Sequence, residues 1–238
     1  MKKNKYILAL FLVCTILFSS IFFSRYSIVN VKAVNSNIDL KDEFSMKKIE
    51  EKSDTYNIEV YYPETKFSKV NDEVNKKTVK YINEFNEQVK LLSNNNSDIK
   101  YDLKITFDTY GYGDYISYVF HVTSYIGGAH PNTNIFTINY NEKEDKIITV
   151  EDLLKNNPNI VHILSEYTYK ELLQNKKIVE LKDEGMLKNG TSEKKENFEN
   201  FAFTNDGVII FFERYSIAPY YLGEFKVVVP YKILKDVM

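Results

Sequence analysis

The hydrophobic period of this chain changes sharply near residue 95, and that change restricts the fold more than any other feature. Apolar residues from Ser68 to Leu92 recur at steps of three and four, which predicts an amphipathic helix. Apolar and polar residues then alternate from Tyr101 to Phe107, which predicts a strand with one solvated face. A long helix beside such a strand favours a layer in which the helix covers a sheet.

Residues 56–140 are expected to form a first sub-domain around this helix. The segment Asn57–Pro63 has the composition of a strand, and Pro63 should end it because proline cannot donate to a ladder. Two later segments, Tyr115–Tyr125 and Ile135–Tyr140, have strand composition and are separated from their neighbours by glycine-bearing turns. Antiparallel hairpins are the simplest arrangement for these strands.

Residues 141–238 are expected to form a second sub-domain. Thr149 and Asp152 have the spacing of a capping box, so a helix should begin there. Asp206-Gly207 indicates a hairpin, and the apolar run Val208–Phe212 predicts a central strand buried on both faces. The other expected segments are a strand at 146–149, a helix ending near Leu173, an exposed excursion at 182–200, a strand at 225–229 and a final helix at 231–237. The predicted fold class is therefore α+β, with two small sub-domains that each pack antiparallel strands against one or two helices.

The first 33 residues have the pattern of a signal peptide or a single membrane anchor. A basic flank precedes an apolar run over residues 6–23. This run predicts one passage through the cell membrane, with the C-terminal domain outside the cell. Cleavage after Val31-Lys32-Ala33 is the alternative, and it makes the protein a secreted one. Residues 34–55 are polar and are expected to form a stalk. The single cysteine, Cys14, lies inside the apolar run, so no internal disulfide is expected.

The charge of the exported part is negative. Five of the 31 basic residues precede residue 34, which leaves 26 against 33 acidic residues, and 26 − 33 gives a formal charge of −7. Such a surface repels phosphate backbones, so nucleic acid is not an expected partner. A cationic protein or a wall polymer is compatible with this charge.

His130 is the first candidate for chemistry, because it lies in the turn YIGGAHPNTN with two glycines and a proline. A zinc site needs three or four converging ligands, and only His121 and His162 could join it, without any metal-binding spacing. No serine lies in a nucleophile elbow. We therefore expect His130 to belong to a hairpin bend first and to be a contact point second, with no metal and no cofactor.

Tyrosine is unusually frequent, with 19 Tyr and 16 Phe but no Trp. Rigid amphipathic rings gathered at turns favour a binding face for a protein or a glycan. The alternative is that most of these rings pack in the core. The tyrosines proposed for the binding face, together with His130, are Tyr110, Tyr112, Tyr125, Tyr215, Tyr220 and Tyr221.

Two segments resemble a known family: YIGGAHPNT at 125–133 and FTNDGVIIFFERYSIAPYYLGEFKVVVPYKIL at 203–234. They are similar to the extracytoplasmic domain of unknown function in RsiV-type anti-sigma factors, which sense lysozyme, and in the accessory region of PdaC-type peptidoglycan deacetylases. The resemblance covers roughly residue 56 to the end. The positions that carry the family's motifs are Gly127, Gly128, Ala129, His130, Tyr215, Ile217, Ala218, Pro219, Tyr220, Gly223, Pro230 and Tyr231.

The resemblance concerns a domain, since neither a sigma-binding segment nor a deacetylase domain is expected in this sequence. We therefore expect a membrane-anchored envelope protein, without enzymatic activity, whose extracellular domain binds a lysozyme-like protein or peptidoglycan. The alternative is a peptidoglycan hydrolase or deacetylase that uses His130 with a nearby carboxylate such as Asp108 or Asp114. A spacer without any ligand is a third hypothesis.

Overall fold

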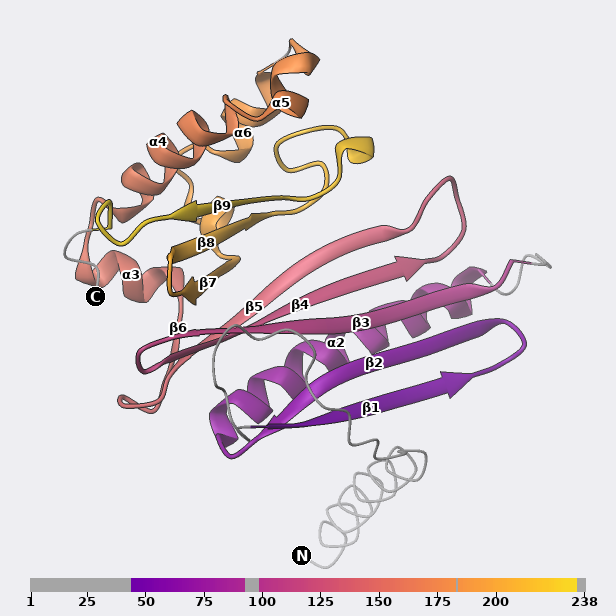
Figure 1. Ribbon diagram of the computed structural model, residues 1–238. Helices are drawn as coiled ribbons and strands as arrows, with labels where there is room; N and C mark the ends of the chain where they lie inside the picture. Colours follow the sequence, from indigo (N-terminus) through magenta and orange to yellow (C-terminus); the bar gives the residue numbers. More distant parts are fainter. Residues whose placement is uncertain (1–43, 93–98, 183, 235–238) are drawn as a thin grey trace, which may run out of the picture.

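The computed structural model describes residues 44–92, 99–182 and 184–234, which form two sub-domains with one β-sheet each (Figure 1). The predicted membrane segment at 6–23, its cleavage site and the first part of the stalk lie outside the described residues. Among the described residues, no helix is both long and apolar enough to span a membrane. The predicted α+β fold with two sub-domains is confirmed.

The first sub-domain is a six-stranded sheet in the order β1-β2-β3-β4-β5-β6, with one long helix. Its pairs are antiparallel except β2 with β3, which run parallel because α2 connects them. The predicted hairpins of β3, β4 and β5 are therefore confirmed. The elements are β1 (Phe44–Lys52), β2 (Tyr56–Thr65), α2 (Ser68–Leu92), β3 (Tyr101–Tyr112), β4 (Tyr115–Tyr125), β5 (Asn132–Asn141) and β6 (Lys146–Ile148).

Helix α2 begins and ends where the sequence period predicts, and its apolar face lies on the sheet. Val70, Val74, Ile82, Phe85 and Val89 are buried, and they pack with apolar residues of β2, β3, β4 and β5. Full burial of side chains of this size stabilises the fold by about 1.5–3 kcal/mol each. This helix therefore covers one face of the large sheet along most of its length (Figure 1).

The second sub-domain packs short helices on a three-stranded antiparallel sheet in the order β7-β8-β9. The central strand β8 is buried at all six positions, as the apolar run predicts. The capping box of α3 is present, with the Thr149 amide donating to Asp152 Oδ2 at 3.1 Å. The elements are α3 (Val150–Asn156), α4 (Ile160–Leu172), α5 (Lys176–Leu181), α6 (Gly185–Gly190), η3 (Lys195–Phe198), β7 (Phe201–Thr204), β8 (Gly207–Phe212), η4 (Tyr220–Leu222) and β9 (Phe225–Val229).

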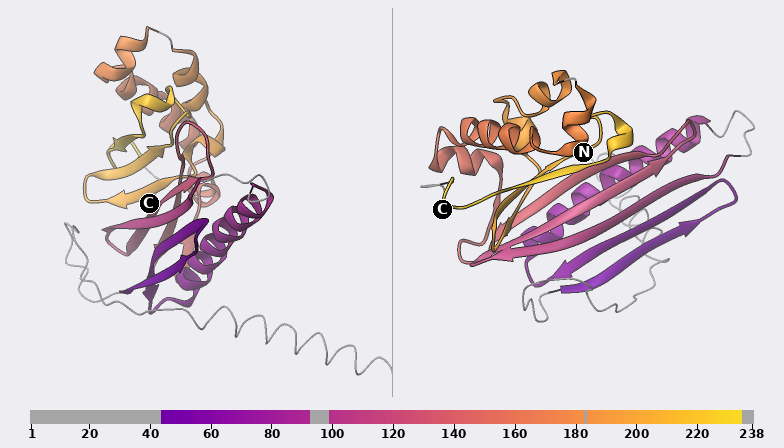
Figure 2. Two further views of the ribbon diagram at one scale, coloured as in Figure 1. Left: turned by 90° about the vertical axis from the view of Figure 1, so that its right-hand side faces the viewer. Right: turned by 45° about the horizontal axis from the view of Figure 1, so that its top comes forward.

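The small sheet packs on the face of the large sheet that α2 does not cover (Figure 2). Tyr118 and Phe120 of β4 face α2, so the intervening Val119 points to the opposite face, where it packs with Ile209 and Phe211 of β8. Polar contacts fix the position of β7: the Phe203 amide donates to Ser117 Oγ at 2.9 Å, and Asn139 Nδ2 donates to the Phe201 carbonyl at 3.0 Å. Ser117, Asn139 and their partners are buried, so the junction is a well-packed interface.

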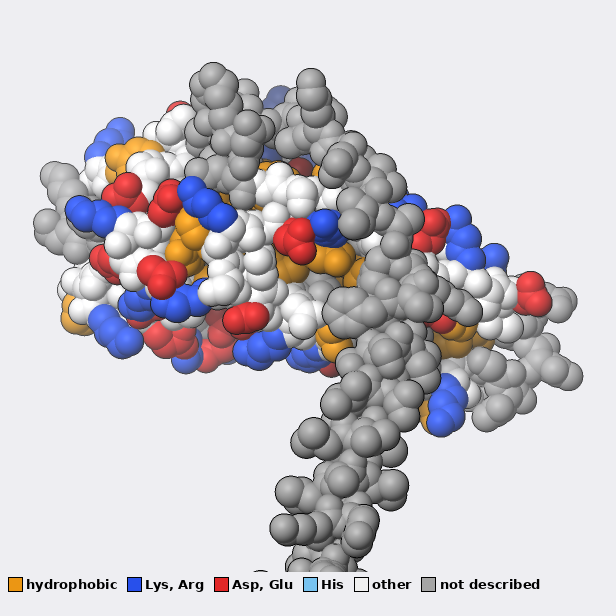
Figure 3. Space-filling view, turned by 90° about the horizontal axis from the view of Figure 1, so that it is seen from below, with side chains coloured by type: hydrophobic (Ala, Val, Ile, Leu, Met, Phe, Trp, Pro, Cys, Tyr) orange, Lys and Arg blue, Asp and Glu red, His pale blue; other side chains and the backbone are white. Residues whose placement is uncertain are grey.

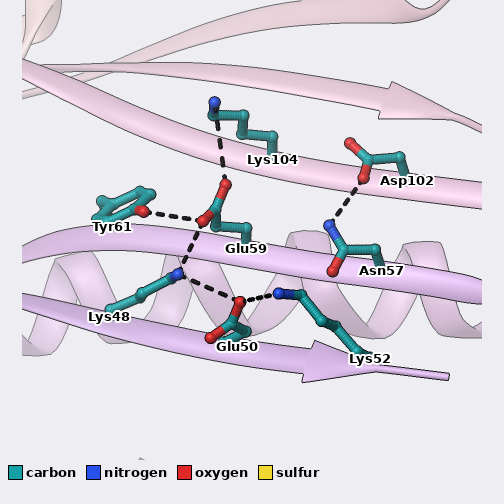
Figure 4. A network of polar contacts seen from close by, with 8 residues as sticks. All are labelled: Lys48, Glu50, Lys52, Asn57, Glu59, Tyr61, Asp102 and Lys104. Carbon is teal, nitrogen blue, oxygen red and sulfur yellow. Dashed lines mark hydrogen bonds and ion pairs between the residues drawn. The ribbon is translucent and has the colours of Figure 1, made fainter. Parts of the chain in front are cut away.

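The expected stalk at 34–55 is wrong for residues 44–52, which form strand β1. The sequence does not indicate this strand because many of its side chains are charged. In the structure these side chains pair with side chains of β2. Lys48 Nζ lies 2.8 Å from Glu59 and 3.3 Å from Glu50, and Tyr61 donates to Glu59 at 2.8 Å (Figure 4). Hydrogen bonding to Glu59 raises the pKa of Lys48 above its usual range.

Three further expectations are corrected. Strand β2 continues past Pro63 to Thr65, because beyond Val60 it pairs with β1 alone and a missing donor on the other side costs nothing. The boundary between sub-domains lies after β6, which pairs with β5 and belongs to the large sheet. Residues 231–234 form turns in place of the expected helix, and residues 235–237 lie outside the described part.

The expected exposed excursion at 182–200 is also wrong, because the segment forms α6 and η3 and contributes to the core. Leu187 and Phe198 are 1% and 0% exposed and join the main cluster of the second sub-domain. Gly190 lies so close to the loop before η4 that an added Cβ would be 2.1 Å from the Ser216 carbonyl oxygen. The segment therefore supports the loop that carries Tyr215.

Candidate binding site at the junction of the sub-domains

The two motif segments meet in space, although His130 and Tyr220 are 90 positions apart in the sequence. His130 lies in the turn between β4 and β5, and Tyr220 lies in the loop between β8 and β9. Their rings stack with centroids 3.6 Å apart and planes at 16°. Tyr220 also donates its hydroxyl to the Pro131 carbonyl at 2.9 Å. We call His130, Tyr215, Tyr220 and Arg214 the junction cluster.

The turn that carries His130 depends on its glycines. Gly127 and Gly128 have φ angles of +92° and +105°, which residues with a Cβ rarely adopt. Tyr125 donates its hydroxyl to the Gly128 carbonyl at 3.2 Å and closes the bend. This part of the hairpin prediction is confirmed, and the bend brings His130 against the second sub-domain.

The contacts of His130 fix its tautomer. Nδ1 lies 3.1 Å from the Pro131 carbonyl oxygen, which can only accept, so Nδ1 carries the proton. In the neutral ring Nε2 is then an acceptor, and it faces the Tyr215 hydroxyl at 3.4 Å. Tyr215 has a φ of +66°, a left-handed conformation that is uncommon for a side chain of this size. The loop thus holds Tyr215 in a strained position beside the imidazole.

Arg214 completes the cluster, and sequence reasoning missed it. Its guanidinium carbon lies 4.5 Å from the centre of the Tyr220 ring, and Nη1 donates to the Tyr220 carbonyl at 3.1 Å. It is the one arginine among the described residues, with Arg25 outside them. Its Nε is buried and has no hydrogen-bond partner within the described chain. Burial of an unpartnered donor costs about 1–3 kcal/mol, so this guanidinium is a candidate for ligand binding.

The outer part of the junction cluster is open to solvent. Tyr215 is 57% exposed, and Tyr221, the next residue after Tyr220, is 74% exposed. His130 and Tyr220 are half-buried below them. Large exposed rings beside a partly buried cation form a surface that suits ligand contact more than packing. Of the tyrosines proposed from sequence, the structure therefore brings Tyr215 and Tyr220 against His130, Tyr125 closes the turn that carries His130, and Tyr221 follows Tyr220 in the same loop.

Tyr110 and Tyr112 lie elsewhere, at the other end of β4. Tyr110 packs with Phe211 at a centroid distance of 6.3 Å, as part of the contact between the sheets. Tyr112 stacks on Tyr231 at 4.3 Å. Strand β3 continues through the expected turn to Tyr112, so both rings belong to the sub-domain interface and do not reach His130.

The pairing of His130 with Asp108 or Asp114 is not observed. Asp108 binds His121, with 3.2 Å between Oδ2 and Nε2, and this hydrogen bond holds the pKa of Asp108 below its usual range. Glu224 Oε2 lies 3.9 Å from the other nitrogen of His121. The described residues contain no group of three or more His, Cys, Asp or Glu side chains placed to hold a metal ion.

Two family models match this chain, one in each sub-domain, and the first match ends within β5. Residues 49–133 match the family model described as deacetylase PdaC, and residues 151–232 match DUF3298, a protein family of unknown function. A curated relative, the peptidoglycan-N-acetylmuramic acid deacetylase PdaC of Bacillus subtilis, is 31% identical over 185 residues. That match covers 77% of this chain and 39% of the relative, so the chain spans well under half of that protein's length.

Two solved structures share the fold at low sequence identity. A DUF3298 family protein from Pseudomonas aeruginosa has a TM-score of 0.58 at 13% identity, covering 83% of this chain and 95% of that one. A DUF3298 family member from Bacteroides fragilis has a TM-score of 0.55 at 17% identity, covering 81% and 92%. The resemblance stated from the motifs is confirmed: this chain carries a PdaC-type segment followed by a DUF3298 segment, and the junction cluster joins the two.

Proposed function

We propose that this protein is a recognition domain of the bacterial cell envelope that binds peptidoglycan without transforming it. The observation that carries the proposal is the junction cluster, in which exposed tyrosine rings lie beside a partly buried arginine. Sugar rings pack on aromatic side chains, and the polar edge of tyrosine adds hydrogen bonds. The similarity to a peptidoglycan deacetylase over 77% of this chain supports the same class of ligand.

The contacts of His130 support binding over catalysis. A general base needs a partner that orients it and a pKa tuned to its task, usually by a carboxylate. Among the described residues, His130 instead contacts a carbonyl and two tyrosines, and its ring is stacked on one of them. An imidazole held in this way presents an edge and a face to a ligand. We therefore propose a binding protein, exported and held at the membrane by residues 6–23 or secreted after cleavage.

A cationic protein such as a lysozyme is the second candidate ligand. It is supported by the formal charge of −7 on the part of the chain after residue 33, which accelerates encounter with a basic partner. On the face seen in Figure 3, however, basic and acidic side chains are mixed over the visible described surface. On this face the charge is spread, whereas the aromatic rings of the junction cluster are concentrated, and this difference favours peptidoglycan.

Co-sedimentation with purified insoluble peptidoglycan tests the proposal. We expect the full chain, kept in mild detergent because of its apolar leader, to sediment with peptidoglycan and to release neither acetate nor new reducing ends. A competition arm with soluble lysozyme identifies the second candidate. If immobilised lysozyme captures the protein and peptidoglycan does not retain it, the ligand is a cationic protein and not peptidoglycan. Release of acetate contradicts a role in binding alone.

His130→Ala and Tyr112→Ala form a matched pair of variants for this assay. Both remove a ring that stacks across the sub-domain junction, but only His130 lies at the open end. We expect His130→Ala to weaken retention about tenfold, the value of one lost stacking contact of about 1–1.5 kcal/mol. Tyr112→Ala should lower stability and leave the affinity of the folded protein unchanged. Equal losses of affinity in the two variants contradict the assignment of the site.

A further inference from the structure

We propose that Arg214 binds a carboxylate of the ligand, so that the junction cluster recognises saccharides that carry an acidic group. This inference deepens the proposed function and depends on it, since it names the chemical class that the same site selects. It concerns a residue that contacts Tyr220, the tyrosine that stacks on His130.

The guanidinium of Arg214 is held in place and has donors to spare. One of its five N–H groups is used within the described chain, by Nη1 at 3.1 Å from the Tyr220 carbonyl oxygen. Its Nε is buried without a partner, and no ion pair joins Arg214 to a carboxylate of the described residues. A folded protein rarely leaves a charged donor unpaired, and Nη2, which has no hydrogen-bond partner within the described chain and is not buried as Nε is, is the part of the guanidinium that a ligand can reach.

The acidic side chains nearest in sequence are committed elsewhere. Glu213, directly before Arg214, accepts a hydrogen bond from the Ile135 amide on β5. Glu224, at the end of the same loop, lies 3.9 Å from His121. The loop therefore carries two carboxylates within eleven residues of Arg214, and both have other partners. The positive charge of Arg214 is thus available to pair with an anionic group of a ligand.

A carboxylate fits this site better than other acceptors. Guanidinium and carboxylate are both planar and match through two parallel hydrogen bonds. Tyr220 stacks on His130 and also contacts the guanidinium of Arg214. These contacts hold the guanidinium in place before a ligand binds, which reduces the entropy lost on binding. No second cation contacts the cluster within the described residues, so the site suits a single negative charge. Exposed Tyr215 and Tyr221 lie beside it and can pack on a sugar ring.

Peptidoglycan offers such a carboxylate from two sources: the lactyl group of a muramic acid residue without its peptide, and the carboxylates of the peptide stem. Isothermal titration of the full chain with defined ligands separates them. The ligands are the disaccharide GlcNAc-MurNAc with a free lactyl group, its methyl ester, a muropeptide whose lactyl group is amidated, and the neutral disaccharide of GlcNAc. Glycerol phosphate serves as a competitor of different anion chemistry.

We expect at least one carboxylate ligand to bind, and Arg214→Gln to weaken it about 10- to 100-fold, the value of a charge-assisted hydrogen bond. The neutral disaccharide should bind both proteins equally. Stronger binding of the free disaccharide than of its ester assigns the lactyl group, whereas binding of the muropeptide alone assigns the stem. Arg214→Lys keeps the charge but loses the two parallel N–H donors of the guanidinium, so its affinity should lie between those of Arg214→Gln and the natural chain. Lys232→Gln, with the same charge change on an exposed side chain of the same sub-domain, should change nothing.

Three results would overturn the inference in different ways. If Arg214→Gln, shown by its unfolding transition to be folded, binds every ligand as the natural chain does, Arg214 has no such role while the proposed function stands. If the natural chain binds none of the saccharides and does not sediment with peptidoglycan, the proposed function fails and the inference falls with it. Competition by glycerol phosphate at equal strength contradicts selection for a carboxylate.

Discussion

The two ends of the sub-domain junction are built from the same residue types but differ in exposure. At one end, Tyr112 stacks on Tyr231 at 4.3 Å, and Tyr115 packs with Phe203 at 4.3 Å. At the other end, His130 stacks on Tyr220 at 3.6 Å. Strand β4 connects the two ends and spans on the order of 35 Å. At the first end Phe203 is 1% exposed and Tyr112 is 36% exposed, whereas the second end carries Tyr215 and Tyr221, at 57% and 74%, and an arginine with unpaired donors. We call the first end closed and the second end open.

This difference separates stability from recognition. At the closed end the Tyr231 hydroxyl is used internally, because it donates to the Thr204 carbonyl at 2.7 Å. At the open end Tyr215 and Tyr221 keep more than half of their surface in solvent, and Arg214 keeps free donors. We therefore expect mutations at the closed end to change the free energy of unfolding, and mutations at the open end to change ligand affinity.

The largest effect is expected at the closed end, for Phe203→Ala. Phe203 is 1% exposed, and its loss leaves a cavity beside Tyr115 and the second sub-domain's core. Such a change lowers the free energy of unfolding by about 3–5 kcal/mol. Urea unfolding followed by circular dichroism measures it. Val228→Ala, on a side chain that is 38% exposed, is the control and should cost less than 1 kcal/mol. A loss below 1 kcal/mol for Phe203→Ala contradicts a closed, tightly packed end.

A smaller effect is expected for Tyr231→Phe, which keeps the stack on Tyr112 and removes the hydrogen bond to Thr204. We expect a loss of about 0.5–1.5 kcal/mol in the free energy of unfolding. Burial raises the pKa of Tyr231 well above its ordinary value, so the folded state holds this proton more tightly than the unfolded state. Its contribution is complete below about pH 10 and is lost as the pH rises further.

Titration of the phenol absorbance checks the second half of this prediction. In the folded natural chain, several tyrosines should ionise late, among them Tyr140, whose pKa burial raises to about 12. The amplitude of this late phase should fall by one tyrosine in Tyr231→Phe. Tyr221→Phe is the matched control, because Tyr221 is 74% exposed. If the amplitude of the late phase is the same in Tyr231→Phe as in the natural chain, the Tyr231 hydroxyl does not belong to it.

The sequence predicts those parts of the fold that depend on local patterns. Helix α2, strand β4 and strand β9 have the predicted bounds because hydrophobic period is a local property. Strand β1 is not predicted, because its charged side chains pair with side chains of β2 and a local sequence pattern does not show such pairs. Leu187 and Phe198 are isolated apolar residues in a polar segment, so their burial depends on distant contacts.

The candidate site is predicted in part, and for a different reason. His130 and Tyr220 are found through motifs of a resembled family, and the structure brings them together. Arg214 is missed because one arginine forms no pattern in a sequence. Tyr110 and Tyr112 are grouped with the site only because they are tyrosines at a turn, whereas their positions depend on how β8 and Tyr231 pack on β3. Residue type therefore indicates which contacts a tyrosine can make, and tertiary packing decides which of the tyrosines lie at the site.

Tyr215→Ala tests the open end, where stability should change little. The ring is 57% exposed, its hydroxyl lies 3.4 Å from His130, and its centroid lies 5.5 Å from that of Tyr220, so we expect a change within about 0.5 kcal/mol in the free energy of unfolding. Binding of peptidoglycan should weaken several-fold in the co-sedimentation assay. Tyr215→Gly is a useful companion, because glycine adopts the observed φ of +66° without strain. A large loss of stability with unchanged binding would reverse the comparison between the two ends.

The smallest effect is expected for Glu213→Gln, which concerns the pH dependence of the open end. Burial raises the pKa of Glu213 above its usual value, with Glu224 adding to the effect and the Ile135 amide opposing it. A carboxyl group with a raised pKa in the folded state stabilises the fold below its unfolded pKa of about 4.5, and this contribution is lost as the pH rises through the folded pKa.

Glutamine has no such titration but can still accept the Ile135 hydrogen bond. The free energy of unfolding of the variant relative to the natural chain should therefore rise between pH 4 and the folded pKa and then stay constant, as urea titrations at successive pH values would show. A flat difference for Glu213→Gln would mean that this carboxyl is solvated, and the open end would then extend beneath Tyr215 to β5.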